Sequence, residues 1–396
     1  MSEWRETTLG DVLTLQRGFD LPARDRLDGP YPIVSSSGVT GYHSVAKVDP
    51  PGVVIGRYGS LGSVHWLTEP YWPHNTALWI KEFKGNDPRF TSYLLRTISH
   101  DGSAAAAVPG VNRNHLHALR VRVPDVVTQR RIAAVLTSFD ELIAINERRI
   151  DVLEGLARSL YREWFVRYRF PGHELHRDDG SAAGEPPNGW PTGNVEDFLN
   201  VVGGGTPSKR EPAYWNGGSV DWYTPSDLTR SSNRFAHESS DRITDLGVQK
   251  SAARLFPPGS VLMTSRATLG VLAIATSTAT CNQGFIVISP SDGIPPTFVY
   301  EWLSDQESRL RSIATGATFK EITKGAFKRF PFVMPSVDVM AVFTDVVSPI
   351  ERQIATLECA SRAHARTRDL LLFRLVSGRL DISEIDLGDL LASEAA

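Results

Sequence analysis

The sequence predicts an α+β protein in which one architectural plan occurs twice, each time as a globular α/β part followed by a long helix. Three observations support this fold class. The chain is self-similar at a spacing near 190 residues, strand-like runs fill the first part of each copy, and heptad patterns fill the second. With 396 residues, 41% of them hydrophobic, each copy is long enough to bury its own core.

The internal repeat rests on four matches that occur in the same order in both halves. They pair Trp4 and 9–13 with Trp190 and 195–199, 51–62 with 258–270, 75–80 with 282–287, and 116–124 with 327–335. The offset grows from 186 to 211, so the second copy carries 25 additional residues in its loops. Four ordered matches point to a duplicated structural unit rather than to chance similarity.

Short runs rich in β-branched and aromatic residues predict the strands of both globular parts. We expect strands over 53–58, 63–67 and 77–83 in the first copy, and over 260–265, 271–276 and 285–290 in the second. Clusters of Gly, Pro, Ser and Asn between these runs predict loops. The segment Asp49-Pro50-Pro51-Gly52 is expected to be the turn that leads into the first of these strands.

The two long helices carry capping and heptad signals. Ser138 with Glu141, and Ser348 with Glu351, have capping-box spacing, and we expect a helix of about 30 residues to follow each of them. Apolar residues at 4-3 spacing predict an antiparallel coiled coil whose two helices are related by a pseudo-two-fold axis. Two amphipathic helices packing on separate cores are the alternative. The predicted seam is Ile132, Leu136, Phe139, Ile143, Ile150, Leu153, Leu160, Trp164, Phe343, Val347, Ile350, Ile354, Leu357, Leu371 and Leu375.

These patterns divide the chain into six segments. We expect a first globular domain over 1–124, a helical spacer over 125–170, a polar Gly/Pro-rich linker over 171–189, a second globular domain over 190–335, a second helical spacer over 336–378, and an acidic tail over 379–396.

Charge, cysteine content and hydropathy limit the class of protein. The net charge is −3, but residues 171–190 contribute −3 and residues 377–396 contribute −4, so the rest of the chain is positive by 4. This distribution leaves room for a face that contacts nucleic acid. Two distant cysteines form no disulfide or metal pattern, and the first residues lack the apolar core of a signal peptide. A cytoplasmic protein without membrane contact is expected.

Motifs that would carry catalysis are weak in this sequence. The Asp49-Pro50-Pro51-Gly52 segment is similar to the Asp/Asn-Pro-Pro-aromatic motif of adenine methyltransferases, but glycine replaces the aromatic ring that stacks on a flipped base. The run Gly203–Thr206 lacks the lysine of a phosphate-binding loop. His115 and His117 alternate as on a strand and have no partners at metal spacing. We therefore expect no catalytic residue and no metal site.

Loops at matching positions of the two copies instead carry side chains suited to DNA. Arg reaches guanine, Asn and Gln reach adenine, and Lys and hydroxyl groups hold phosphates. Arg234 lies in the same predicted loop region as Arg230, and we expect it to face DNA as well. The candidate DNA-binding residues are Arg17, Arg24, Ser36, Arg57, Tyr58, Ser60, Asn75, Asn112, Arg113, Thr206, Lys209, Arg210, Arg230, Ser265, Arg266, Thr268, Asn282, Gln283, Lys320 and Lys324.

The chain resembles the specificity subunits of type I restriction–modification systems. The resemblance rests on the repeated domain-plus-helix plan, on Leu9–Leu13, on Arg57–Gly62 with its relative Ser265–Gly270, and above all on Gln129–Leu136 with Tyr161–Phe165 and Phe170–Glu174. The second copy departs from this pattern, because Met340-Ala341-Val342-Phe343 replaces the Gln-Arg-Arg-Ile stretch.

The resemblance implies two target recognition domains that read the halves of a split, asymmetric double-stranded DNA site. It implies helices that set the unread gap and that dock two adenine-methylating modification subunits, with a restriction motor-nuclease joining the full complex. S-adenosylmethionine, ATP and Mg²⁺ would bind only to those partner subunits, and this chain would catalyse nothing by itself. A lone methyltransferase or nuclease, and a coiled-coil scaffold with protein-binding heads, are the rival interpretations. Salt-dependent binding to duplex DNA separates a reader from a scaffold.

Overall fold

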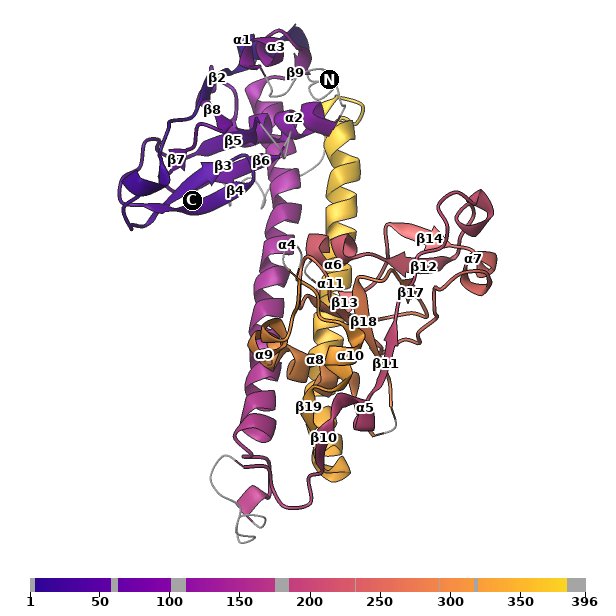
Figure 1. Ribbon diagram of the computed structural model, residues 1–396. Helices are drawn as coiled ribbons and strands as arrows, with labels where there is room; N and C mark the ends of the chain where they lie inside the picture. Colours follow the sequence, from indigo (N-terminus) through magenta and orange to yellow (C-terminus); the bar gives the residue numbers. More distant parts are fainter. Residues whose placement is uncertain are drawn as a thin grey trace. The chain divides into compact units, whose positions relative to one another are not determined.

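The computed structural model describes residues 4–57, 63–100, 112–174, 185–231, 233–291, 293–316 and 320–382. The chain divides into two compact units, one comprising residues 1–144 and 362–396 and the other residues 145–361. Each unit therefore holds one globular α/β part, the first half of one long helix and the second half of the other (Figure 1). No helix within the described ranges is both long enough and apolar enough to cross a membrane.

The first unit contains a four-stranded sheet in the order β2-β8-β5-β6, a three-stranded sheet β4-β3-β7 and the ribbon β1-β9. Its elements are β1 (Arg5–Thr8), α1 (Leu9–Val12), β2 (Thr14–Arg17), η1 (Ala23–Asp25), β3 (Tyr31–Ser35), β4 (Gly38–His43), β5 (Gly52–Gly56), β6 (Val64–Leu67), β7 (Trp72–Pro73), β8 (Ala77–Glu82), α2 (Pro88–His100), α3 (Arg113–His117) and β9 (Arg120–Val123). The long helix α4 (Val126–Tyr161) begins in this unit.

The second unit contains a five-stranded sheet in the order β11-β18-β15-β16-β13, a three-stranded sheet β14-β12-β17 and the ribbon β10-β19. Its elements are η2 (Arg162–Val166, a π-helical turn that ends α4), β10 (Thr192–Asn194), α5 (Val195–Phe198), β11 (Asn200–Gly203), η4 (Pro212–Tyr214), β12 (Val220–Tyr223), α6 (Pro225–Ser231), β13 (Phe235–Ala236), β14 (Asp241–Ile243), α7 (Asp245–Gln249), β15 (Val261–Thr264), β16 (Leu272–Ala275), β17 (Thr280–Cys281), β18 (Phe285–Ser289), α8 (Pro296–Asp305), α9 (Glu307–Ser312), α10 (Lys324–Lys328) and β19 (Pro331–Val333). The long helix α11 (Val337–Val376) begins here.

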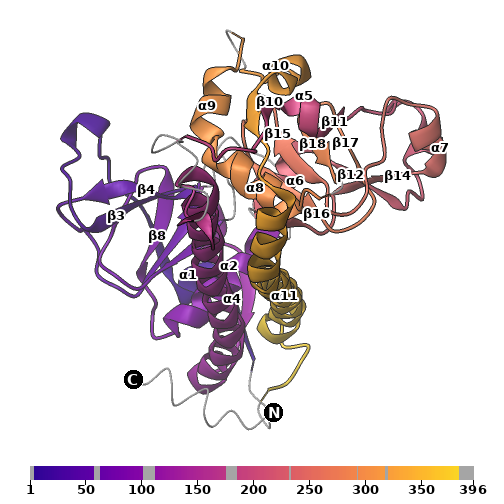
Figure 2. The ribbon, with the colours of Figure 1, turned by 90° about the horizontal axis from the view of Figure 1, so that it is seen from below.

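The same strand pairing recurs in both units. β5 pairs antiparallel with β6 and β8, and β15 pairs antiparallel with β16 and β18. The only parallel pairs among the described strands of the three-stranded sheets are also equivalent, β3 with β7 and β12 with β17. In Figure 2 the β14-β12-β17 sheet lies on the side of its unit that faces away from α11. The predicted α+β fold with two copies of one plan is confirmed, and β5 begins at Gly52, one residue before the predicted strand.

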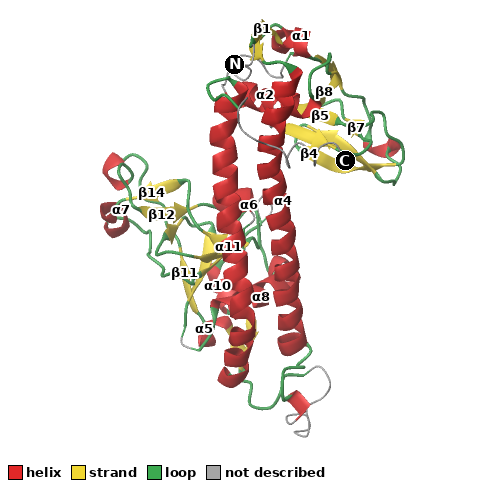
Figure 3. Ribbon diagram, turned by 180° about the vertical axis from the view of Figure 1, so that it is seen from behind, coloured by secondary structure: helices red, strands yellow, loops and turns green. Residues whose placement is uncertain are grey.

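Both long helices begin earlier than their predicted capping boxes. Asp125 caps α4, because its carboxylate accepts hydrogen bonds from the backbone N–H and the hydroxyl of Thr128, both at 2.9 Å. Ser336 takes the same position for α11, where its hydroxyl accepts from the N–H of Val339 at 3.3 Å. The starts predicted at Ser138 and Ser348 are therefore wrong, and Pro349 lies inside α11. Figure 3 shows both helices continuing without a break.

Within each unit the two helix halves run antiparallel. In the first unit Asp140 pairs with Arg368, and Arg131, earlier on α4, donates a hydrogen bond to the carbonyl of Ile382, later in the chain. In the second unit the rings of Trp164 and Phe343 have centroids 5.6 Å apart. All fifteen residues of the predicted seam are buried or half-buried.

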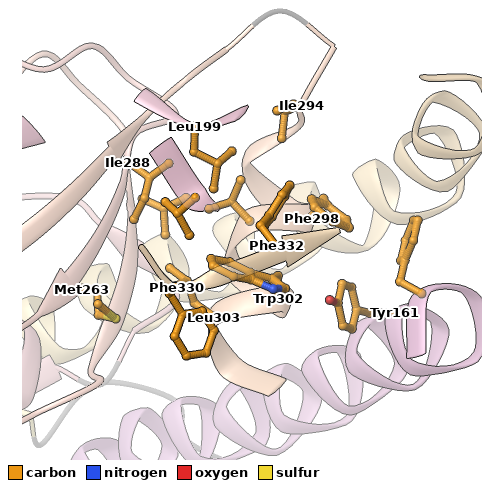
Figure 4. Close-up of a cluster of buried hydrophobic side chains, with 14 of the residues drawn as sticks. Tyr161, Leu199, Met263, Ile288, Ile294, Phe298, Trp302, Leu303, Phe330 and Phe332 are labelled. Atoms are coloured by element: carbon orange, nitrogen blue, oxygen red, sulfur yellow. The ribbon is translucent and has the colours of Figure 1, made fainter. Parts of the chain in front are cut away.

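The long helices also contribute apolar side chains to the hydrophobic cores of the two globular parts. Ile132, Leu136 and Leu375 are at most 1% exposed and belong to one cluster with the strands of the first unit. In the corresponding cluster of the second unit, Phe298 contacts both Tyr161 and Phe332 (Figure 4). Parts of both long helices therefore pack on the separate cores of the two units, as the alternative expected.

Candidate nucleic-acid interface

The loops that carry the candidate residues are built on a glycine at equivalent positions of the two units. Gly18 follows β2 and packs against the backbone of His74, while Gly204 follows β11 and packs against the backbone of Asn282. A Cβ atom at either glycine would overlap with the carbonyl oxygen of that neighbour. Only glycine permits this close approach of two loop backbones.

Matching hydrogen bonds hold these loops at the end of the three-stranded sheet. In the first unit the N–H of His74 donates to the carbonyl of Val34 at 2.8 Å; in the second the N–H of Asn282 donates to the carbonyl of Tyr223 at 2.9 Å. The following residues, Asn75 and Gln283, are thus presented by the same backbone framework. The repeat therefore extends to the geometry of the loops, but the register predicted from sequence, 75 with 282, is wrong by one residue.

In the first unit, Arg17 and Asn75 lie together. The Arg17 Nε donates to the Asn75 carbonyl at 3.2 Å, and the Asn75 amide nitrogen donates to the Asp20 carboxylate at 2.5 Å. Asn75 therefore presents its amide with one donor already engaged by an acidic residue that sequence reasoning missed. A ligand that needs this donor has to compete with Asp20.

Ser36 has a structural role in the same cluster. Its side chain is buried, donates to the carbonyl of Thr76 at 2.5 Å and accepts from the backbone N–H of Arg57 at 3.0 Å. Its own carbonyl accepts a hydrogen bond from the Ser63 hydroxyl at 2.6 Å. Ser36 thus fastens the loop that carries Arg57, and it positions neighbours rather than presenting a group of its own.

The remaining candidates of the first unit do not join this cluster. Arg24 is exposed on η1 beside Asp25, and Asn112 caps α3 by accepting from the N–H of Asn114 at 3.0 Å. Arg113 is exposed on α3, a helix whose His117 accepts a hydrogen bond from the N–H of Leu15 at 2.9 Å. Since Leu15 and Arg17 are two residues apart on β2, α3 lies toward the start of that strand. Tyr58 and Ser60 fall outside the described residues.

In the second unit the turn after β17 gathers several candidates. The Thr206 hydroxyl donates to the Gln283 side-chain oxygen at 2.6 Å. The Asn282 side-chain oxygen accepts from the N–H of Gly284 at 2.8 Å, and the Gly284 carbonyl accepts from the N–H of Ser265 at 2.7 Å. Thr206, Asn282, Gln283 and Ser265 thus form one hydrogen-bonded cluster, in which Ser265 is buried.

Arg266 extends from this cluster and is half-exposed. Its Nε lies 2.8 Å from the Glu321 carboxylate, and this ion pair raises the pKa of the guanidinium. Two further candidates are exposed: Thr268, two residues after Arg266, and Lys320, directly before Glu321. Lys324 opens α10 and extends its side chain toward Gly203. Equivalent hydrogen bonds from Gly56 to Ser63 and from Thr264 to Val271 align Arg57 with Ser265, in the same register as the sequence match of Arg57–Gly62 with Ser265–Gly270.

A second group in this unit surrounds β14. Lys209 lies 5.0 Å from the ring centroid of Trp215 and 3.4 Å from the Asp241 carboxylate. Arg230 donates to the Ser240 hydroxyl at 3.1 Å, and Arg210 is exposed on the loop that bears Lys209. The loop that bears Lys209 is fixed to β12, because the Trp222 Nε1 donates a hydrogen bond to the carbonyl of Gly205 at 3.0 Å.

Two sequence interpretations are wrong here. Arg234, grouped with the DNA-facing loop residues, is only 1% exposed and forms ion pairs with Glu301 and Glu351. His115 and His117 lie on the helix α3 and not on a strand. Local sequence favoured a solvated loop at Arg234 because its acidic partners stand 67 and 117 residues away.

Comparison with known proteins shows which family has this arrangement. A model of the type I restriction modification DNA specificity domain matches residues 1–155 and again residues 187–359. The chain belongs to this family. The two matched segments correspond to the two copies of the repeat.

Relatives of the family are similar to this chain over different lengths. A specificity subunit named MjaIX from Methanocaldococcus jannaschii is 33% identical over 184 residues, which cover 44% of this chain and 42% of that subunit. The HindI specificity subunit of Haemophilus influenzae is 21% identical over 337 residues, covering 70% of this chain and 72% of that one. The S subunit of M. genitalium shares the fold, with a TM-score of 0.58 at 14% identity over 96% of this chain and 97% of that structure.

In this member of the family, the positive charge of the loops comes from arginine and lysine. Burial lowers the pKa of His65, and burial together with Arg26 lowers that of His74, so both rings are neutral at pH 7. Among the described residues no group of three His, Cys, Asp or Glu side chains is arranged to hold a metal ion. The arrangement as a whole suits polar and cationic recognition of an anionic polymer.

Proposed function

We propose that this chain is the non-catalytic specificity subunit of a type I restriction–modification complex, acting in defence against foreign DNA. Its two recognition domains, over 1–124 and 190–335, would each read one half of an asymmetric, bipartite duplex site. The observation that carries the proposal is the recurrence of one glycine-based loop framework in both units, with Asn75 in one and Gln283 in the other at the equivalent position. Amide side chains there suit adenine, and the neighbouring Arg17 and Arg266 suit guanine or phosphate.

The helical spacers over 125–170 and 336–378 would set the gap between the half-sites and dock two modification subunits. Exposed apolar side chains on the helices support a protein partner: Val152 and Leu156 on α4 are 71% and 49% exposed, and Leu370 on α11 is 67% exposed. Large exposed apolar residues on a long helix are typical of interfaces. A motor-nuclease would join through the modification subunits, which would also bring S-adenosylmethionine, while ATP and Mg²⁺ would serve the nuclease.

The decisive experiment is expression of the chain with its modification subunits, followed by mapping of methylated adenines. We expect one split motif with a fixed gap. The chain alone should bind that duplex with an affinity that falls steeply with salt, because phosphate contacts release counterions. A complex that methylates at random, or a chain whose DNA affinity ignores salt, argues for the scaffold alternative.

A further inference from the structure

Glu358 of α11 is a buried carboxylate that accepts hydrogen bonds from one short segment of the second recognition domain. It is 2% exposed. Its oxygens accept hydrogen bonds from the backbone N–H of Arg234 at 2.7 Å, from that of Phe235 at 3.3 Å, and from the His237 Nε2 at 2.9 Å. Three donors from four consecutive residues thus converge on one side chain of the helix.

The same segment is also held through the side chain of Arg234. The guanidinium donates to Glu301 of α8 at 2.7 Å and to Glu351 of α11 at 3.1 Å, and it lies 4.1 Å from the ring centroid of Tyr300. Within this segment, β13 is the edge strand of the five-stranded sheet, with Phe235 opposite Ile274. The edge of the sheet is therefore fixed to the helix through ionic groups rather than through apolar packing alone.

Such a cluster is poorly suited to adding stability. Burial raises the pKa of Glu301 although Arg234 opposes the shift, so the desolvation of this carboxylate is not fully offset. Buried ion pairs often contribute no more than apolar residues of the same volume, but their directional bonds fix one arrangement among several. The cluster is better suited to setting the position of residues 234–237.

Immediately after this segment, the chain reaches the groups that hold Arg230. The Ser240 hydroxyl donates to Asp227 at 2.5 Å and accepts from Arg230 at 3.1 Å. The adjoining Asp241 lies 3.4 Å from Lys209. Two candidate DNA-binding cations therefore depend on a loop whose preceding residues are held by Glu358.

We propose that Glu358 is a positioning residue for base recognition by the second domain, acting through residues 234–237 on the loop that holds Arg230 and Lys209. This inference rests on the proposed function. The sequence repeat places Glu147 of α4 at the position equivalent to Glu358, and Glu147 is exposed. The first domain thus does not use a buried carboxylate at this position.

The test uses the chain assembled with its modification subunits, on duplexes that carry the mapped site or a single base change in either half. Discrimination is the ratio of methylation rates on the two duplexes. Glu358→Ala should lower discrimination in one half-site by about tenfold, which corresponds to about 1.4 kcal/mol and lies within the range for one misread base pair. Glu358→Gln keeps an oxygen for the backbone donors and should recover much of it. Glu147→Gln is the matched control and should change neither ratio.

A purely structural role would lower the rates on all duplexes together and leave both ratios intact, and that result overturns the inference. Equal loss of discrimination in both half-sites overturns it as well. If Glu358→Ala does not fold, His237→Ala removes one of the three donors to Glu358 and carries the same test, and an unchanged ratio in that variant is decisive against it. Failure of the proposed function is distinguishable, because it appears already as random methylation by the unaltered complex.

Discussion

The Asp140 carboxylate of α4 accepts a 2.7 Å hydrogen bond from the Arg368 guanidinium of α11, which joins the two helix halves of the first unit. The same carboxylate accepts from the Tyr93 hydroxyl at 2.7 Å and from Arg89 at 3.0 Å, both on α2. One side chain therefore ties the recognition domain to both helices. In the second unit the repeat places Glu351 at this position, where it pairs with Arg234.

Asp140→Asn should destabilise the first unit by about 2–3 kcal/mol, because it removes charge-assisted hydrogen bonds from a carboxylate that is only 17% exposed. Urea unfolding followed by circular dichroism measures the loss. Asp151→Asn changes an exposed carboxylate on the same helix and should stay within about 0.5 kcal/mol. Equal effects of the two substitutions would contradict the assigned role.

The stabilisation by Asp140 should also depend on pH in a defined direction. Burial alone raises the pKa of this group, but Arg96, Tyr93 and Arg368 more than compensate and lower it below the ordinary value. A carboxyl group with a lowered folded pKa contributes fully above the unfolded pKa of about 3.9 and loses its contribution as pH falls through the folded value. The difference between wild type and Asp140→Asn should therefore be constant from neutral pH down to about pH 5 and shrink below that.

Gly18→Ala and Gly204→Ala should each displace a recognition loop, because the added Cβ overlaps with a backbone oxygen that cannot rotate away. We expect a loss of about 1–3 kcal/mol in stability and weakened DNA binding. Gly155→Ala on α4 is the control, since nothing lies within 4 Å of its Cβ position and alanine favours a helix by roughly 0.5–1 kcal/mol. The melting temperatures of the three variants should show this order of stability, with Gly155→Ala above both loop variants.

Arg57→Ala and Arg266→Ala should weaken different half-sites. The first residue lies on the loop fastened by Ser36, and the second extends from the cluster around Gln283. A loss of roughly 1–3 kcal/mol at one half-site is expected for a base contact. Competition binding with duplexes altered in one half at a time measures it. If either substitution weakens both halves equally, the division into two readers fails.

Shortening the helices should shorten the unread gap. Removing 143–149 from α4 and 360–366 from α11 takes out one heptad from each and about 10 Å of helix, which corresponds to roughly three base pairs. A deletion of 354–360 is unsuitable, because it also removes Glu358 and the buried Ile354. A gap that is shorter by about three base pairs also changes the angle around the duplex at which the two half-sites face the protein. The expected results are therefore a shorter gap, or no binding if the recognition domains cannot adjust to that angle. Methylation mapping that returns the original gap would show that the helices do not set it.

The parts of the fold that sequence analysis predicted well are those with local or repeated signals. The strand at Val53 and its relative at Val261 follow from apolar runs and from the repeat, and both lie in sheets with the same pairing. The helix starts were misplaced because Ser138 and Ser348 have capping-box spacing but lie mid-helix, where each hydroxyl donates to a carbonyl three or four residues earlier.

The candidate site was harder, since its side chains depend on distant partners. Asn75 and Gln283 were each predicted from residue type, but the sequence match paired Asn75 with Asn282, one residue away from its structural counterpart Gln283. The engagement of Asn75 by Asp20, and of Arg266 by Glu321, had no sequence signal, because each acidic partner lies on a separate loop. Burial of Arg234 was equally invisible, since it arises only when α8 and α11 pack on the same sheet edge.

The core of the first unit is completed by Leu372, Leu375, Val376 and Ile382, which are all at most 3% exposed and belong to one cluster with Leu9 and Val53. During synthesis, the amino-terminal domain therefore emerges long before the residues that close its core. At roughly 5–20 residues per second, the ribosome needs on the order of ten seconds or more to reach them after residue 144. The second unit, whose residues are contiguous, is complete before the first. The last-made domain along the chain is thus the first able to reach its final packing, and a ribosome that stalls near residue 361 would release a protein with its amino-terminal half unfinished.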